Sequence, residues 1–94
     1  MDVVGRGVLE KLKQGHPDVQ SQVAAWLIEV QDARWTTHHD PKKRYPNASI
    51  LSENRVVFNL KGNKYRVQVR IAYRVGTVIV LNAGTHAEYE RWKL

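Results

Sequence analysis

Residues 55–73 alternate between apolar and polar side chains, and the alternation breaks at Gly62-Asn63. Two alternating runs joined by such a dipeptide are typical of a β-hairpin with a two-residue turn. This turn makes one face of the hairpin apolar, through the pairs Leu60 with Tyr65, Phe58 with Val67, and Val56 with Val69. A slip of one residue would turn that face toward solvent, so the pattern fixes the register and makes the apolar face the core side.

The opposite face of the predicted hairpin carries polar and charged side chains. Asn59 lies across from Arg66, and Arg55 lies across from Arg70. Like charges directly opposite one another in a sheet are destabilising. The facing arginines therefore indicate a site kept for an anion.

A third antiparallel strand follows if residues 75–76 form the next turn. In that register Ile71 lies opposite Val80, and the continuing chain brings residues 85–86 level with Arg66. The pattern therefore predicts three antiparallel strands, with the histidine at position 86 near the arginine end of the polar face.

The first third of the chain is predicted to form two helices. Residues 15–18 separate two stretches, and Pro17 suits the first turn of the second helix. Apolar residues recur at helical spacing in both stretches; they are Val8, Leu9 and Leu12, followed by Val19, Val23, Trp26, Leu27 and Val30. Two helices packed as a hairpin are the expected outcome.

Two shorter elements are predicted in the middle of the chain. Asp40 followed by Pro41 has the form of a helix cap and a first-turn proline, which predicts one helical turn through residues 42–44. Residues 48–52 allow a short edge strand.

The C-terminal segment has the form of a capping box, with Thr85 as the cap and Glu88 three residues later. This predicts a short helix that presents His86 and Tyr89 on one face. Together the patterns predict an α+β fold in a single domain over residues 1–94, in which an N-terminal helical hairpin packs on a small antiparallel sheet and a short C-terminal helix follows.

The net charge of +6 comes from one stretch, residues 55–74, which contains six Lys or Arg and no acidic residue. The rest of the chain balances, with seven basic and seven acidic residues in positions 1–53 and two of each in positions 75–94. A focused positive field on a small domain indicates a polyanionic partner such as nucleic acid.

Several kinds of protein are excluded or disfavoured by composition. The absence of cysteine excludes disulfides, thiolate zinc sites and a cysteine nucleophile. No apolar run approaches the roughly 18 residues of a membrane span, and the N-terminus lacks a signal-peptide pattern, so we expect a cytoplasmic protein without membrane contact. His38, His39 and Asp40 are adjacent and have no second cluster with ligand spacing, so we expect neither a metal nor another cofactor.

Two motifs carry a family resemblance, RVVFNLKGNKYRV at 55–67 and GTHAEY at 84–89. They resemble the signature of the HigB-type toxins of type II toxin-antitoxin systems, which are relatives of the RelE-like toxins, and the resemblance spans essentially the whole chain. It implies a RelE-like fold, ribosome-dependent endonuclease cleavage of translated mRNA in the ribosomal A site, and neutralisation by a helix-turn-helix antitoxin of the HigA type.

Metal-independent RNA cleavage requires a base, an acid and cations around the scissile phosphate, because the ribose 2′-oxygen attacks the phosphorus in line. A histidine with the ordinary pKa, about 6.5, exchanges protons at cellular pH, which makes His86 the first choice for proton transfer. Arg66 is expected to hold the phosphate through a bidentate contact, with Arg70 on the same face. Tyr89 is expected to contact the phosphate, stack on a base or pack against the sheet.

The predicted site thus has two groups of residues. The catalytic group is His86, Arg66, Arg70 and Tyr89. The group expected to contact RNA phosphates, with mRNA and ribosomal RNA as partners, is Arg55, Asn59, Lys61, Asn63, Lys64 and Arg74, of which Asn63 is also required by the turn geometry.

A second interpretation is a non-catalytic basic RNA-binding or ribosome-binding module, in which the same arginines bind the RNA backbone and His86 has no chemical role. Sequence-specific DNA binding is a weaker third interpretation, since the basic residues lie on a hairpin and no helix is rich in base-reading residues. Variants of His86 and Arg66 that bind ribosomes without cleaving RNA would distinguish the enzyme from the module.

Overall fold

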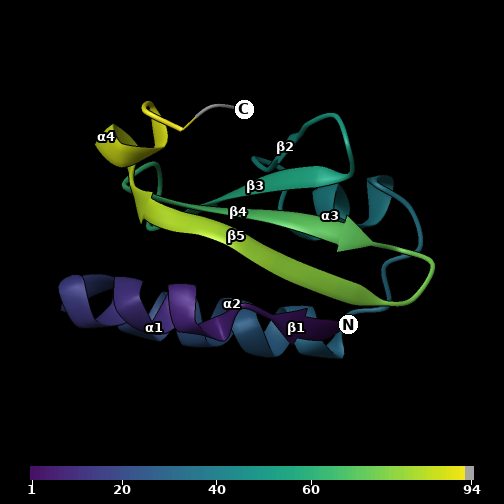
Figure 1. Ribbon diagram of the computed structural model, residues 1–94, viewed down its shortest axis with the longest axis horizontal. Helices are drawn as coiled ribbons and strands as arrows, with labels where there is room; N and C mark the ends of the chain where they lie inside the picture. The colour runs from purple at the N-terminus through teal and green to yellow at the C-terminus, as the bar shows by residue number, and fades with distance from the viewer. Residues whose placement is uncertain (93–94) are drawn as a thin grey trace.

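The computed structural model describes residues 1–92 as four α-helices, one 3₁₀ helix and five strands (Figure 1). In chain order the elements are β1 (Asp2–Val4), α1 (Arg6–Gly15), η1 (Pro17–Val19), α2 (Gln20–Asp32), α3 (His39–Arg44), β2 (Ser49–Ile50), β3 (Arg55–Leu60), β4 (Tyr65–Ala72), β5 (Thr77–Thr85) and α4 (His86–Tyr89). The predicted α+β class, with two N-terminal helices against a sheet and a short C-terminal helix, is confirmed.

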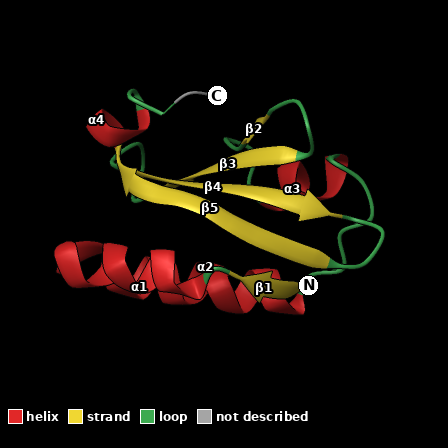
Figure 2. Cartoon of the chain, viewed as in Figure 1, coloured by secondary structure: helices red, strands yellow, loops and turns green. Residues whose placement is uncertain are grey.

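The strands form one sheet in the order β1-β5-β4-β3-β2. Strands β2 to β5 pair in antiparallel fashion, whereas β1 runs parallel to β5. Figure 2 shows α1 and α2 together along one face of this sheet.

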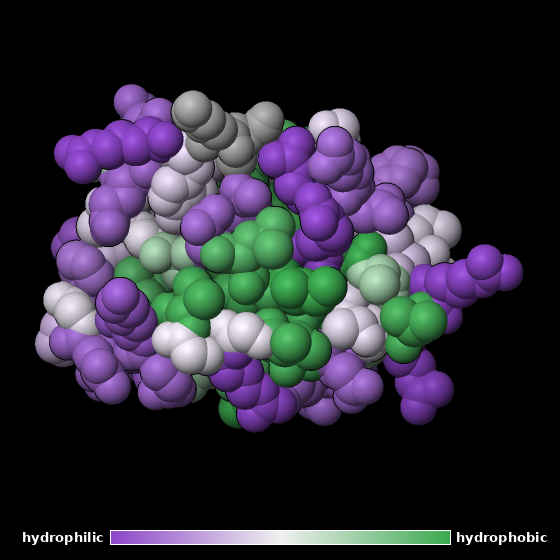
Figure 3. Space-filling view, viewed as in Figure 1, coloured by the Kyte–Doolittle hydropathy of each residue, from purple (hydrophilic) through white to green (hydrophobic). Residues whose placement is uncertain are grey.

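The core lies between the helices and this face of the sheet. Its fully buried side chains include Leu9, Val19, Val23, Trp26 and Val30 from the helical layer and Val56, Phe58, Val67, Val69, Ile71 and Val78 from the sheet. Each such side chain contributes about 1.5–3 kcal/mol by leaving water. Figure 3 shows that apolar side chains also reach the surface in the middle of one face, with hydrophilic side chains around them.

The register predicted for the first hairpin is confirmed along the whole of β3, which pairs with residues 65–70 of β4. Leu60 pairs with Tyr65, Asn59 with Arg66, and Arg55 with Arg70. The period of two therefore places Tyr65 on the helix side of the sheet and its neighbour Arg66 on the opposite side.

The register predicted for the second hairpin is wrong. Residues 73–76 form a four-residue turn, closed by a hydrogen bond of 2.9 Å from Gly76 N to Ala72 O, and Ile71 pairs with Val78 instead of Val80. A shift of two residues keeps every side chain on the same face, so the alternation could not distinguish the two registers.

An irregularity in β5 then moves the strand by one residue. Val69 pairs with Val80 but Gln68 pairs with Asn82, which leaves Leu81 as the extra residue of a β-bulge. Beyond the bulge, residues 84–85 lie opposite residues 66 and 65. The bulge thus sets where β5 ends and α4 begins.

The short elements agree with the predictions in part. The edge strand is confirmed as β2, and the two N-terminal helices are confirmed, the second opening with η1. The predicted cap at Asp40 is wrong, because α3 begins at His39, two residues earlier than predicted, with His38 at the N-cap position. The Asp40 carboxylate instead accepts hydrogen bonds from the backbone amides of Thr36 and Thr37.

Strand β1 was not predicted. Three residues are too few to show an alternation, and the pairing partner of β1 lies at residues 77–79, at the other end of the sequence. Among the helices of residues 1–92, none combines the length and the hydropathy required to cross a bilayer.

Gly5, which joins β1 to α1, has a φ of +86°, and a Cβ atom there would lie 2.7 Å from the Val80 carbonyl oxygen. We therefore expect Gly5→Ala to lower the free energy of unfolding by about 1–3 kcal/mol, through backbone strain and the clash. Urea unfolding of the purified chain measures this. The matched control is Gly7→Ala, in open space on α1, which should leave stability unchanged or slightly raised. Equal stabilities of Gly5→Ala and the wild type would contradict the prediction.

Candidate active site

Arg66 and His86 meet where the start of β4 faces the start of α4. Arg66 Nη2 lies 3.0 Å from His86 Nδ1. The Arg66 guanidinium also lies over the ring of Tyr89, with its carbon 5.2 Å from the ring centroid, and the rings of His86 and Tyr89 are 6.4 Å apart. The structure therefore brings together three of the four residues predicted to be catalytic, although their roles stay predictions.

The contact with Arg66 defines the tautomer of the His86 ring when that ring is neutral. Arginine can only donate, so Nδ1 accepts from Arg66 and the ring proton lies on Nε2. Nε2 lies 3.0 Å from Glu90 Oε1. Because the side chains of His86 and Glu90 are 52% and 66% exposed, a ligand from solvent can reach this proton.

Arg66 itself is only 7% exposed. Its Nη1 donates to the carbonyl oxygens of Asn63 at 2.7 Å and Tyr65 at 3.3 Å, and within residues 1–92 no carboxylate pairs with it. A buried charge is costly unless polar groups compensate it, and here carbonyl dipoles, the His86 imidazole and the Tyr89 ring do so. In this arrangement Arg66 supports His86, while its predicted contact with a phosphate stays a prediction.

The predicted capping box holds α4 in place and is confirmed. Thr85 Oγ1 accepts from the amide of Glu88 at 3.2 Å, and Glu88 Oε1 accepts from the amide of Thr85 at 3.0 Å. The hydrogen bond from the Thr85 amide holds the pKa of the Glu88 carboxyl below its ordinary value. Gly84, opposite Arg66 in the sheet, allows this close packing, since a Cβ atom there would lie 3.1 Å from Glu88 Oε1.

Arg70, the fourth predicted catalytic residue, does not join this cluster. It lies four positions along β4 from Arg66, a distance of about 13 Å along a strand. Its Nη2 is 3.3 Å from Glu53 Oε2, and its partner Arg55 donates to Ser52. The chain's own Glu53 carboxylate thus lies at the facing arginines, where we expect an anion to bind, and that expectation stays a prediction.

Two of the residues predicted to contact RNA lie away from the cluster or are already bonded. Asn59 donates to the backbone oxygen of Asn47 at 3.1 Å. Arg74 lies in the turn between β4 and β5, at the end of the sheet opposite α4 (Figure 1). There it lines an open cavity of about 730 Å³ together with Arg34 and Trp35.

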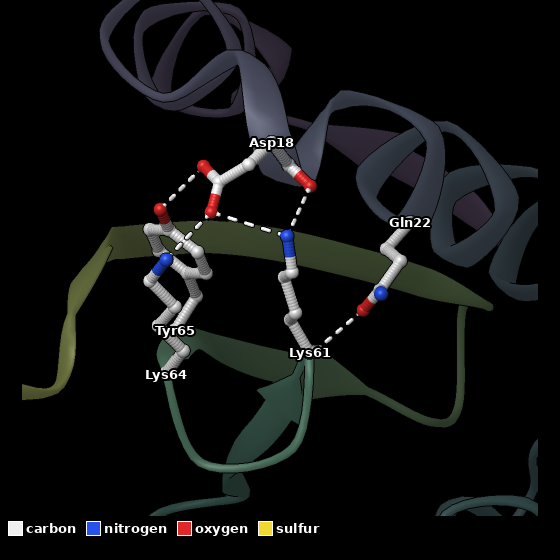
Figure 4. Close-up of polar contacts among 5 residues, drawn as sticks. All are labelled: Asp18, Gln22, Lys61, Lys64 and Tyr65. Carbon is white, nitrogen blue, oxygen red and sulfur yellow. Dashed lines mark hydrogen bonds and ion pairs between the residues drawn. The ribbon is translucent and has the colours of Figure 1, made fainter.

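The turn at residues 61–64, which we call the hairpin tip, is bonded to the helical layer through Asp18 (Figure 4). The Asp18 carboxylate accepts from Lys64 Nζ at 2.8 Å, from the Tyr65 hydroxyl at 2.6 Å and from Lys61 Nζ at 3.3 Å. Hydrogen bonds from Lys64 and Tyr65 hold the pKa of Asp18 well below its ordinary 3.8, and the same contact raises the pKa of Lys64. Both predicted RNA-contacting lysines are thus paired within the protein.

Sequence reasoning missed two residues around the site. Glu90 stands four positions after His86, the spacing that places two side chains on one helix face, so this signal was present. Asp18 had no local signal for its contacts, because its partners lie more than 40 residues away. Residues 1–92 contain no group of three or more His, Asp or Glu side chains that could hold a metal ion.

Comparison with known protein families finds a match over residues 19–92 of the 94, to the HigB toxin family, described as the RelE-like toxic component of a toxin-antitoxin system. The chain belongs to the HigB toxin family. A search of curated proteins found no match to the sequence. As a HigB-family toxin, this protein has an antitoxin as its partner. The family resemblance of residues 55–67 and 84–89 is thereby confirmed.

The Asp18 contacts predict a pH dependence of stability in this HigB-family toxin. The pKa of Asp18 is lower in the folded chain than in the unfolded chain. The contribution of Asp18 to stability is therefore fully present above its pKa in the unfolded chain, and it is lost as the pH falls through its pKa in the folded chain. We expect Asp18→Asn to lower the free energy of unfolding more at about pH 6 than at about pH 2. Urea unfolding at both pH values measures this, and an equal loss at both would contradict it.

Proposed function

We propose that this toxin is a ribosome-dependent endoribonuclease that cleaves translated mRNA and so inhibits translation. The observation that carries the proposal is the 3.0 Å contact between Arg66 and His86, which leaves a proton on the exposed side of the imidazole. The membership of the HigB toxin family supports it.

The proposed reaction is attack of a ribose 2′-oxygen on the adjacent phosphorus. The 2′-oxygen loses its proton and forms a bond to phosphorus, the bond from phosphorus to the 5′-oxygen breaks, and the leaving oxygen takes up a proton. The products are a 2′,3′-cyclic phosphate and a 5′-hydroxyl. No metal takes part in this scheme.

The side chains of the cluster match these steps. His86 is the acid for the leaving oxygen as an imidazolium, formed when Nδ1 takes up a proton and parts from Arg66, and its Nε2–H faces solvent. The Glu90 carboxylate, 3.0 Å from that nitrogen, stabilises the imidazolium, and the proton of the 2′-hydroxyl passes to solvent water. The guanidinium of Arg66 has no carboxylate partner within residues 1–92, so its charge remains to stabilise the negative charge that develops on the phosphoryl oxygens.

The remaining predicted residues have supporting roles in this proposal. Tyr89, already over the guanidinium of Arg66, offers its ring to an unpaired base. Arg55, Arg70 and Arg74 add affinity for RNA phosphates without reading sequence. We also propose that the antitoxin is a helix-turn-helix protein of the HigA type and that the toxin acts in the cytoplasm, where ribosomes and mRNA are found.

Induced expression in a bacterium tests the proposal, with mapping of mRNA 5′ ends in the presence and absence of a drug that blocks ribosome entry on mRNA. We expect new cuts within translated frames that disappear when ribosome entry is blocked. His86→Ala should weaken the cuts by about 10²- to 10⁴-fold, because the acid is lost, and Glu90→Gln should weaken them because the carboxylate is lost.

His38→Ala is the matched control, since His38 is another exposed histidine at a helix start, with its ring 4.1 Å from that of His39. It should cut as the wild type does. Growth arrest without cuts would contradict the proposal and favour the non-catalytic ribosome-binding module.

A further inference from the structure

The hairpin tip at residues 61–64 contacts two different parts of the protein. One side faces the helical layer, where Asp18 and Gln22 lie, as Figure 4 shows. The other side faces Arg66 and His86. The turn therefore stands between the N-terminal helices and the candidate active site.

On the helix side, hydrogen bonds converge on the tip and the adjacent strand end. Asp18 accepts from the side chains of Lys61, Lys64 and Tyr65 over 2.6–3.3 Å. Lys61 Nζ also donates to the Asp18 carbonyl oxygen at 3.2 Å, and the Lys61 amide donates to Gln22 Oε1. Tyr65 is 2% exposed, so its end of the network is fixed within the core.

On the site side, two backbone carbonyls of the same tip hold the side chain of Arg66 and the backbone of His86. Arg66 Nη1 donates to Asn63 O at 2.7 Å, and the His86 amide donates to Lys64 O at 3.0 Å. The 3.0 Å contact between the guanidinium and the imidazole therefore depends on where these two carbonyls lie.

We propose that Asp18 is a positioning residue for the Arg66–His86 pair and acts on it through the hairpin tip. Within residues 1–92 no hydrogen bond or ion pair joins Asp18 to Arg66 or His86, and Asp18 stands one residue before the segment matched by the family. A kinetic test of this proposal rests on the proposed function, whereas a test by NMR of the His86 imidazole does not.

A simpler interpretation is that Asp18 only neutralises two exposed lysines. Exposed ion pairs on their own contribute little, and neutralisation alone does not require a bond to the hydroxyl of Tyr65, which lies directly beside Arg66 in β4. If Asp18 only neutralised the lysines, its removal would free Lys61 and Lys64 to bind RNA phosphates. The affinity for the mRNA-bearing ribosome would then rise and depend more steeply on salt. The two interpretations thus predict opposite results.

The first experiment measures cleavage of a defined mRNA on purified ribosomes by the full chain carrying Asp18→Ala. We expect kcat to fall roughly 10- to 100-fold, because a small displacement of the reacting groups is enough for such a loss, while KM for the mRNA-bearing ribosome stays within about twofold of the wild-type value. Asp18→Asn keeps the volume of the side chain and one oxygen acceptor, so its kcat should lie between those of the wild type and Asp18→Ala.

Asp40→Ala is the matched control. The Asp40 carboxylate also accepts three hydrogen bonds, but from Thr36 and Thr37 at the start of α3, away from the hairpin tip. We expect it to lower stability to urea and leave kcat unchanged. A general loss of stability would lower the activities of both variants together, so the comparison separates positioning from folding.

The second experiment observes the imidazole of His86 by nitrogen NMR of the free protein and does not depend on cleavage. The wild type should show Nε2 protonated and Nδ1 accepting a hydrogen bond. Asp18→Ala should shift these resonances toward exchange between tautomers, whereas Asp40→Ala should not. If the wild type cleaves no RNA, the proposed function fails while this measurement still decides the role of Asp18.

Three results would overturn the proposal. One is an unchanged His86 spectrum in a folded Asp18→Ala protein. Another is tighter ribosome binding by Asp18→Ala with unchanged kcat, which would show a carboxylate that masks two lysines. The third is loss of folding in both Asp18→Ala and Asp18→Asn, which would make Asp18 a stability residue.

Discussion

The pairing of β3 with β4 is the constraint on which the rest of the structure depends. In this register Tyr65 points into the helical layer and Arg66 points to the opposite side of the sheet. Two neighbouring residues thereby connect the core and the candidate active site. The turn that closes the hairpin contributes to the core and to the candidate active site. The lysines of the turn donate to Asp18, and the backbone carbonyls of the turn accept from Arg66 and His86.

The concentrated positive charge has a more internal role than composition alone indicates. Lys61 and Lys64 pair with Asp18, Arg70 pairs with Glu53, and Arg66 is buried against carbonyls, an imidazole and an aromatic ring. The acidic partners come from other segments of the chain. Much of the local field therefore fixes the hairpin to the fold, and Arg66 combines a buried charge with a position beside an exposed histidine.

The sequence predicted best those features that depend on alternation and local motifs. The first hairpin, the two N-terminal helices and the capping box at Thr85 all follow from such patterns. The second hairpin failed because a shift of two residues leaves the faces unchanged, and the bulge at Leu81 is a local irregularity with no pattern of its own. The two errors partly compensate, so His86 still meets Arg66 although the register between them was wrong.

Contacts between distant segments could not be predicted in the same way. Strand β1 pairs with β5 across most of the chain, and Asp18 and Glu53 find their cationic partners only after folding. Sequence spacing could place Glu90 beside His86 but not show that Arg66 fixes which ring nitrogen carries the proton. That assignment required the side chains of β4 and α4 together.

The central claim is that the site beside Arg66 and His86 cleaves RNA by attack of a 2′-oxygen. Its most direct test uses purified toxin and ribosomes carrying an mRNA with a single 2′-deoxynucleotide at the mapped cut. The account predicts that this substitution abolishes cleavage there, while the unmodified mRNA yields a 2′,3′-cyclic phosphate and a 5′-hydroxyl. Cleavage of the deoxy-substituted mRNA at the same position would contradict it.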